Sequence, residues 1–280
     1  MKSRFCRRFC RNQGAVFGLL VLMLVALAAA VGPFVAQYDA WDMAGVPFQA
    51  PMAGHGMPLG TDTMGRDILS GLVAGGRVSL LIGVVSTVVS LLIGVGVGAV
   101  SGYFGGWIDA TLMRFTELFQ AIPSFALAIV LVAIFQPSVQ SIVAAIAVVS
   151  WPPVARLVRS EFLTLRQRDF VAAAQLAGQS TPRIILTQIL PNAASPIVVM
   201  ASLMVATAIL LESSLSFMGL GDPNQMTWGY MIGSARTVLR QAWWMAVFPG
   251  VAILLTVLAL NLVGEGLNDG LNARADGSGK

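Results

Sequence analysis

Long apolar runs alternate with shorter polar segments along the whole chain. A helix that crosses a membrane needs about 20 mainly apolar residues, because each residue rises ~1.5 Å through a hydrocarbon core of ~30 Å. Six runs meet or nearly meet this length, at 15–36, 78–101, 112–135, 140–158, 193–217 and 245–264. The pattern therefore predicts an all-α, polytopic membrane protein with six spanning helices.

Two of these runs allow another interpretation. The fourth contains Pro152 and Pro153, but a spanning helix tolerates proline where neighbouring groups satisfy the freed carbonyls, so we expect a kink and not a break. The first has a basic start and an Ala-rich patch, as a cleaved signal peptide does. Its apolar run is longer than the roughly 7–15 residues usual in a signal peptide, so we predict an uncleaved first helix.

Composition and charge agree with a membrane location. Of the 280 residues, 56% are hydrophobic and only 11% are charged, whereas about a quarter of the residues in a soluble domain are charged. The net charge of +4 would also suit a nucleic-acid-binding protein, but the charges cluster at the edges of the apolar runs. Charges placed in this way orient a membrane protein, so we expect contact with membrane lipid and no nucleic-acid partner.

The distribution of Lys and Arg predicts the orientation of the spans. With the N-terminus inside, thirteen of these residues fall in cytoplasmic segments and four in external ones, which places both termini in the cytoplasm. The expected divisions are a cytoplasmic tail (1–14), the first span (15–36), an external segment (37–77), a core of five spans (78–268) that includes a cytoplasmic elbow (161–191), and a second cytoplasmic tail (269–280).

Three glycines in the second run lie on one face of the expected helix. Gly94, Gly98 and Gly102 repeat every four residues. This spacing lets two spanning helices approach closely, and no strand precedes it, so it predicts a packing seam and not a dinucleotide-binding loop.

No catalytic constellation is visible in the sequence. The single histidine, His55, stands in a Gly- and Pro-rich segment, and one histidine does not make a metal site. No Walker-type phosphate loop is present. We therefore expect this chain to be no enzyme and to hold no cofactor or metal of its own.

The segment between the fourth and fifth runs predicts two helices joined by a turn. Residues 161–177 are good helix formers, and Gly178 follows as a C-cap. The tripeptide Ser-Thr-Pro at 180–182 then offers a hydroxyl N-cap and a proline at the first helical position. The second helix is expected to stop at Pro191. This elbow is either a loop that lies on the bilayer or a docking surface for a soluble partner.

The elbow carries a motif with a family resemblance. The segment from Ala172 to Gly178, followed by Ile189, Leu190 and Pro191, resembles the EAA loop of permease subunits of bacterial ATP-binding cassette importers. That loop consists of EAA, three residues, glycine, nine residues and I-x-L-P. The spacing from glycine to proline matches. Two positions differ: Ala172 stands where the motif has glutamate, and Gln188 stands where it has the first isoleucine.

Other segments extend the resemblance over nearly the whole chain. Residues 59–70, 102–109, 215–221 and 261–269 resemble, in order, segments of the dipeptide, oligopeptide and nickel permeases. Among the paired permeases of that family, the chain is similar to the "C" subunit.

The resemblance implies a type I permease fold with six spans in the bacterial inner membrane. It implies a heterodimer with a second permease subunit, one or two ATP-binding subunits that hold ATP and Mg, and an external solute-binding protein. The elbow would couple this chain to the ATP-binding subunits. The residues implied in coupling are Asp169, Ala172, Ala173, Ala174, Gly178, Thr181, Pro182, Arg183, Leu190 and Pro191.

Glu212 is the clearest charged residue within a span, and Ser213 and Ser216 stand beside it. A carboxylate that faced lipid would be costly, so Glu212 is expected to be either a strut between helices or part of the translocation path. Nearer the inner end of the third run, Arg114 and Glu117 are three residues apart and can form a pair on one helix face.

The external segment before the second run shows an amphipathic pattern over residues 61–77, which predicts a helix on the outer surface. Asp62, Arg66 and Asp67 would be either rim charges of a platform for the binding protein or local helix caps.

Taken with the resemblance, the sequence predicts inward transport of dipeptides or oligopeptides, driven by ATP that partner chains hydrolyse. Two alternatives stay open. The same machinery could import nickel or another metal chelate, or the chain could be a stand-alone secondary transporter or channel.

Overall fold

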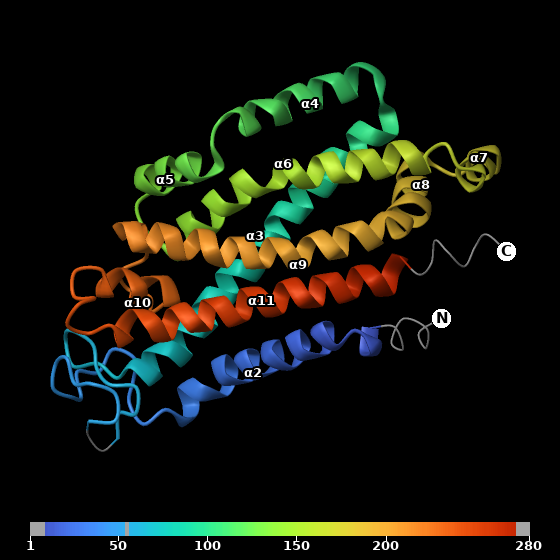
Figure 1. Cartoon of the computed structure of the whole chain (residues 1–280). Helices are drawn as coiled ribbons and strands as arrows, with labels where there is room; N and C mark the ends of the chain where they lie inside the picture. Colours follow the sequence, from blue (N-terminus) through green and yellow to red (C-terminus); the bar gives the residue numbers. More distant parts are fainter. Residues whose placement is uncertain (1–8, 54–55, 273–280) are drawn as a thin grey trace.

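The computed structural model describes residues 9–53 and 56–272, which form a bundle of long helices (Figure 1). In chain order the elements are α2 (Gln13–Val35), α3 (Ile68–Phe104), α4 (Gly106–Ala121), α5 (Ser124–Phe135), α6 (Val139–Leu165), α7 (Asp169–Leu176), α8 (Thr181–Ile184), the π turn η1 (Ile185–Ile189), α9 (Leu190–Leu215), the π turn η2 (Ser216–Leu220), α10 (Trp228–Ala235) and α11 (Trp244–Asn272). Among the described residues, the strand-type pairing is limited to one isolated bridge between Thr61 and Asp67. The all-α fold class is confirmed. His55 and most of the two predicted tails lie outside the described residues.

Within the described ranges, five helical stretches are long and apolar enough to cross a membrane. They are α2, α3, α6, the continuous run from α8 to η2, and α11; a sixth crossing results if α4 and α5 are counted as one bent span. The start of α2 and the end of α11 lie at the same end of the bundle (Figure 1), where Asn12 Nδ2 donates to Asp269 Oδ2 at 3.0 Å. The prediction of six spans is therefore met when α4 and α5 together count as one bent span.

The third predicted span is not one straight helix. α4 and α5 meet at an angle of 83° across Ile122 and Pro123. Ile122 is extended (φ −92°, ψ 130°), because a proline disfavours helical geometry in the residue before it and has no N–H to donate. The expectation of a single helix over 112–135 was therefore wrong.

The predicted outer helix over 61–77 is also wrong as a separate element. Residues 61–67 form a turn, and Asp67 caps α3 by accepting a hydrogen bond from Ser70 N at 2.8 Å. From Ile68 the chain continues without a break into the second span, so α3 is 37 residues long.

The glycine seam predicted on the second span is present. A Cβ placed on Gly98 would lie 2.5 Å from Ala155 O, and one on Gly102 would lie 2.6 Å from Phe162 Cβ. Gly94 meets Val154 of α6 in the same way, at 2.5 Å. Only glycine lets α3 and α6 come this close, so the prediction of a packing seam is confirmed.

α6 stays one helix through Pro152 and Pro153, so the prediction that these prolines do not break it is confirmed. Trp151, directly before them, is buried and packs against α4. Its ring centroid lies 6.1 Å from that of Phe115 and 5.3 Å from that of Phe119.

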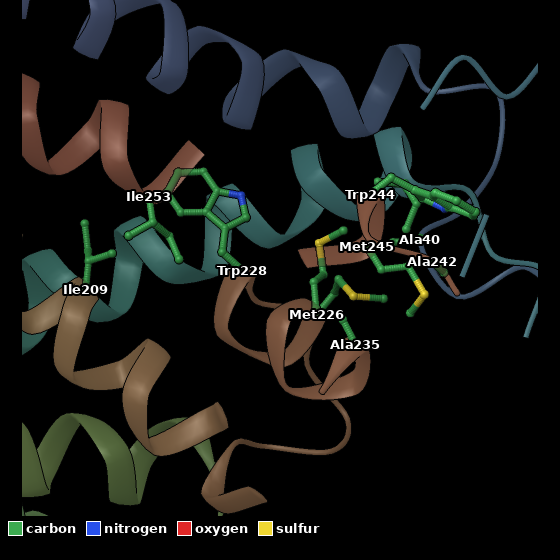
Figure 2. Packing of buried hydrophobic residues seen from close by; sticks show 11 residues of the cluster. Ala40, Ile209, Met226, Trp228, Ala235, Ala242, Trp244, Met245 and Ile253 are labelled. Carbon is green, nitrogen blue, oxygen red and sulfur yellow. The ribbon is translucent and has the colours of Figure 1, made fainter. Parts of the chain in front are cut away.

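The two ends of the bundle differ in content. The elbow end carries α7 and α8, and the loop end carries residues 36–53, residues 56–67 and α10 (Figure 1). A cluster of large side chains fills the loop end; Figure 2 shows Met226, Trp228, Trp244 and Met245 within it. Trp228 Nε1 donates to Leu72 O at 2.8 Å, which fixes α10 against α3.

Candidate functional site

The elbow begins where α6 ends at Leu165. The helix predicted over 161–177 is wrong as one element, because the chain turns at 166–168 and leaves helical geometry at Arg168 (φ −80°, ψ 148°). Asp169 then opens α7, where an acidic residue in the first turn suits the positive end of the helix dipole.

The C-terminus of α7 is closed by a complete Schellman motif. Gly178 has φ +74°, its N–H donates to Gln175 O at 3.0 Å, and Gln179 N donates to Ala174 O at 3.1 Å. A left-handed residue at this position satisfies carbonyls that the helix leaves free, and glycine adopts that geometry without a Cβ clash. The predicted C-cap is confirmed.

The second helix of the elbow starts as predicted but does not stop at Pro191. Thr181 and Pro182 open α8, and the chain continues through the π turn η1 into α9. Pro191 stands in the first turn of α9, directly after the π turn, where the regular hydrogen bonding is already interrupted. The proline is therefore accommodated without ending the helix.

One face of α7 is attached to the bundle and the other is free. Val171 and Ala174 are buried against Ile184 and Ile189. Leu176, on the opposite face, is 90% exposed. Of the residues implied in coupling, Asp169, Ala172, Ala173, Gly178, Pro182, Arg183 and Pro191 are also exposed, Thr181 and Leu190 are half-buried, and Ala174 is buried.

Glu212 lies in a buried cluster between α9 and α10. It is fully buried, and its Oε1 accepts from Ser216 Oγ and from Thr227 Oγ1, both at 2.8 Å. Thr227 in turn caps α10 by accepting from Tyr230 N at 2.9 Å. A Cβ on Gly229 would lie 2.9 Å from Glu212 Oε1, so α10 sits directly on the carboxylate. This geometry favours the interpretation of Glu212 as a strut between helices over its interpretation as part of the translocation path.

Ser213 also contacts the carboxylate, because its Oγ donates to Glu212 Oε2 at 3.4 Å. It lines an open hollow of about 440 Å³, together with Ser214 of α9, Phe217 of η2 and Phe125 of α5. The other residues of the lining are mostly apolar. The structure therefore brings the predicted group together: Ser216 and Ser213 both donate to the Glu212 carboxylate, and Ser213 also lines the hollow.

The three residues predicted as platform charges or helix caps, Asp62, Arg66 and Asp67, act mainly on their own loop. Asp62 Oδ1 accepts from Met64 N at 2.7 Å and from Arg66 N at 2.9 Å. Arg66 is 9% exposed and lies over the ring of Trp41, 4.6 Å from its centroid, while Asp67 is 4% exposed and caps α3. This geometry favours the local-cap interpretation, and Asp62 alone of the three is partly accessible.

Sequence reasoning did not find the ion pair between α4 and α6. Arg159 Nε and Nη2 donate to the two carboxylate oxygens of Asp109 at 2.5 and 2.6 Å. Arg159 is one of the thirteen Lys and Arg residues that predict the orientation, and no spacing in the sequence connects residues 50 positions apart. The predicted pair of Arg114 and Glu117 is present at 3.1 Å, on the surface.

Apolar helices of spanning length, joined by an exposed and capped elbow with an EAA-like motif, define a membrane transport permease. The family described as "Binding-protein-dependent transport system inner membrane component" matches residues 94–277, and the "N-terminal TM domain of oligopeptide transport permease C" matches residues 3–51. The chain belongs to the family of binding-protein-dependent transport system inner membrane components.

Full-length relatives narrow this assignment. The chain is 41% identical over 278 residues to the di/tripeptide transport system permease protein DppC of Pseudomonas aeruginosa (strain UCBPP-PA14), covering 97% of this chain and 92% of that protein. It is 38% identical over 271 residues to the oligopeptide transport system permease protein OppC of Escherichia coli (strain K12), covering 96% and 89%.

Solved structures agree on the fold. A chain of the MetNI methionine ABC transporter in an inward-facing conformation superposes with a TM-score of 0.59 at 18% identity, covering 70% of this chain and 93% of that chain. A second crystal form of the same transporter gives a TM-score of 0.55. The type I permease fold is thus confirmed.

This chain is therefore a permease subunit of an ATP-binding cassette importer of the dipeptide and oligopeptide group, a multi-span protein of the bacterial inner membrane and not an enzyme. In such importers, partner subunits bind the ATP. The stand-alone transporter or channel is excluded by this membership.

Proposed function

We propose that this chain and a second permease subunit form the inward path for dipeptides or oligopeptides, and that its elbow docks on a separate ATP-binding subunit. Both termini and the elbow would then face the cytoplasm, in agreement with the bias of Lys and Arg. The names of the relatives support peptides over nickel as the cargo.

The free face of α7 carries the docking proposal. A short helix that exposes Leu176 at 90% while packing its opposite face on the bundle has apolar area left for a partner to cover. The Schellman cap and the buried Val171 fix the position of α7. A docked subunit that moved α7 would therefore move the helices beneath it.

The hollow beside Ser213 supports a role in the path. It is open on one side, holds about 440 Å³, and combines two serines with apolar side chains. A second permease subunit would supply the opposite wall. At the loop end, an external solute-binding protein would deliver the peptide, and Asp62 with the half-exposed Met64 is the accessible part of the predicted platform.

A charge on the free face of α7 tests the docking. We would express the whole importer with a tag on this chain and compare Leu176→Glu with the unchanged protein. Burying a carboxylate in an apolar contact is costly, so the amount of ATP-binding subunit that co-purifies should fall at least about tenfold, and uptake of labelled dipeptide should fall with it. The second permease subunit should co-purify as before.

Leu239→Glu is the matched control, because Leu239 is an exposed leucine (45%) at the loop end. It should retain the ATP-binding subunits. Normal co-purification and uptake with Leu176→Glu would overturn the docking proposal.

A further inference from the structure

A polar network joins three helices at the elbow end, outside the residues implied in coupling. Its centre is the ion pair of Asp109 on α4 with Arg159 on α6, whose side chains are 16% and 34% exposed. Ser101 of α3 donates a short hydrogen bond to the same carboxylate. Arg166, at the end of α6, donates to Tyr103 O of α3 at 2.7 Å.

The pair holds α4 in a fixed orientation. Two parallel hydrogen bonds between a guanidinium and a carboxylate define both distance and angle, which a single contact does not. Elsewhere along its length, α4 has only Thr116 buried, and its rings Phe115 and Phe119 rest on Trp151. Asp109 is therefore the polar anchor of a helix that lies on the surface of the bundle.

The pair also lies next to the elbow. Arg159 stands two turns before the end of α6, and the chain passes from Arg166 into α7 within three residues. Any displacement of α7 reaches the last turns of α6 first, because these are joined by a short covalent link.

At its far end, α4 leads to the hollow. The chain bends by 83° at Pro123 and enters α5, whose Phe125 lines the hollow with Ser213. α4 has 16 residues and is about 24 Å long, so a rigid α4 connects the elbow end to the wall of the hollow.

We propose that Asp109 and Arg159 are positioning residues that pass movement of the elbow through α4 to the α5 wall of the hollow. This rests on the proposed docking of the elbow. Without it, α4 would still be attached through its aromatic rings, while its elbow end would be free to move independently of α6.

The test measures position and coupling separately. Spin labels at Trp107→Cys and Gln175→Cys, both exposed positions, in a chain with Cys6 and Cys10 replaced by serine, report the distance between α4 and α7. The ratio of peptide imported to ATP hydrolysed, in the whole importer reconstituted with its binding protein, reports coupling. Asp109→Asn and Arg159→Gln are the test variants, and Glu117→Gln on the exposed side of α4 is the control.

We expect each single variant to broaden the label distance and to lower the import ratio about tenfold, with ATP-binding subunits still co-purifying. The double variant should lose no more than the worse single, because both remove the same pair. A pair that only stabilised the fold would lower the yield of complex and leave the import ratio unchanged.

An import ratio equal to that of the unchanged protein in both single variants would overturn the proposal, whether or not the distance broadens. Losses that multiply in the double variant would also overturn it. The label distance is measured on this chain with or without ATP-binding subunits, so a failure of elbow docking would be seen as their absence from the unchanged complex and would be distinguished from a failure of the pair.

Discussion

At the loop end, residues distant in sequence hold one another through buried polar groups. Thr61, fully buried, donates from Oγ1 to Val46 O at 2.6 Å and accepts from Gln49 N at 2.9 Å, while its carbonyl accepts from Trp244 Nε1 at 3.0 Å. Glu212 fixes α10 in the same manner. At the elbow end, α7 is held by a few small apolar contacts and a backbone cap, and it exposes an apolar side chain at its end.

The difference lies in how α10 and α7 are held. Buried polar groups that bond to one another hold α10 within this chain. Exposed apolar area on a capped helix is removed from water only when another surface covers it. The seam packs α3 on α6, two helices that each run from the loop end to the elbow end (Figure 1). Variants in the seam, in the loop end and in the elbow should therefore separate their contributions.

The largest effect is expected from Gly98→Val in the seam. The added side chain would collide with Ala155 O and Val158, and overpacking of this kind costs about 1–3 kcal/mol. Because the seam supports both ends, the thermal midpoint of the purified protein in detergent should fall, and protease cleavage should rise in both ends together.

Gly96→Val is the control for the seam, since a Cβ on Gly96 meets nothing within 4 Å. It lies in the same helix and should leave the midpoint close to that of the unchanged protein. Equal midpoints for Gly98→Val and Gly96→Val would show that the seam is not what joins the ends.

An effect confined to the loop end is expected from Glu212→Leu. The hydroxyls of Ser216 and Thr227 would lose their acceptor, and a buried polar group without a partner costs about 1–3 kcal/mol. Amide hydrogen exchange should accelerate in α10 and stay unchanged in α7. Acceleration in both would contradict the separation of the two ends.

Glu212→Gln keeps a carbonyl acceptor in the same place and should spare assembly. Peptide uptake by this variant decides the remaining question about the carboxylate. Unchanged uptake would leave Glu212 as a strut alone.

The smallest effect on global stability is expected from Gly178→Pro. Proline fixes φ near −65°, whereas Gly178 has φ +74°, so the cap of α7 would be lost. The segment is exposed, and its local opening does not reach the free energy of global unfolding, so the thermal midpoint should hardly change. Association with the ATP-binding subunits should be abolished, as measured by co-purification.

Gly178→Asn is the control, because asparagine tolerates the left-handed region better than other residues with a Cβ. It should retain association. If Gly178→Pro also retained it, the shape of the cap would be irrelevant to docking.

Features with a local cause were predictable from the sequence. The spans follow from hydropathy, because an apolar segment in lipid must pair its own backbone groups and a helix does so within one segment. The cap at Gly178 follows from glycine chemistry, and the seam at Gly98 follows from a four-residue repeat within one helix. In each case the signal lies within one helix or its end.

Features that depend on contacts between helices were not predictable from the sequence. Pro123 bends its span by 83°, whereas Pro152 and Pro191 lie within continuous helices, and nothing in their neighbouring residues separates the cases. The pairing of Asp109 with Arg159 depends on how α4 returns along α6. Such outcomes are set by packing, which one sequence read alone does not specify.

α3 is the one spanning helix that runs diagonally across the others among those drawn in Figure 1. Its 37 residues make it about 55 Å long, well beyond a hydrocarbon core of ~30 Å, so it must tilt, project from the bilayer, or both. α3 also packs on α2, α6 and α9, so these helices could slide along their axes only by changing the tilt of α3. Such a change would disturb the close contact of α3 with α6 at Gly94, Gly98 and Gly102.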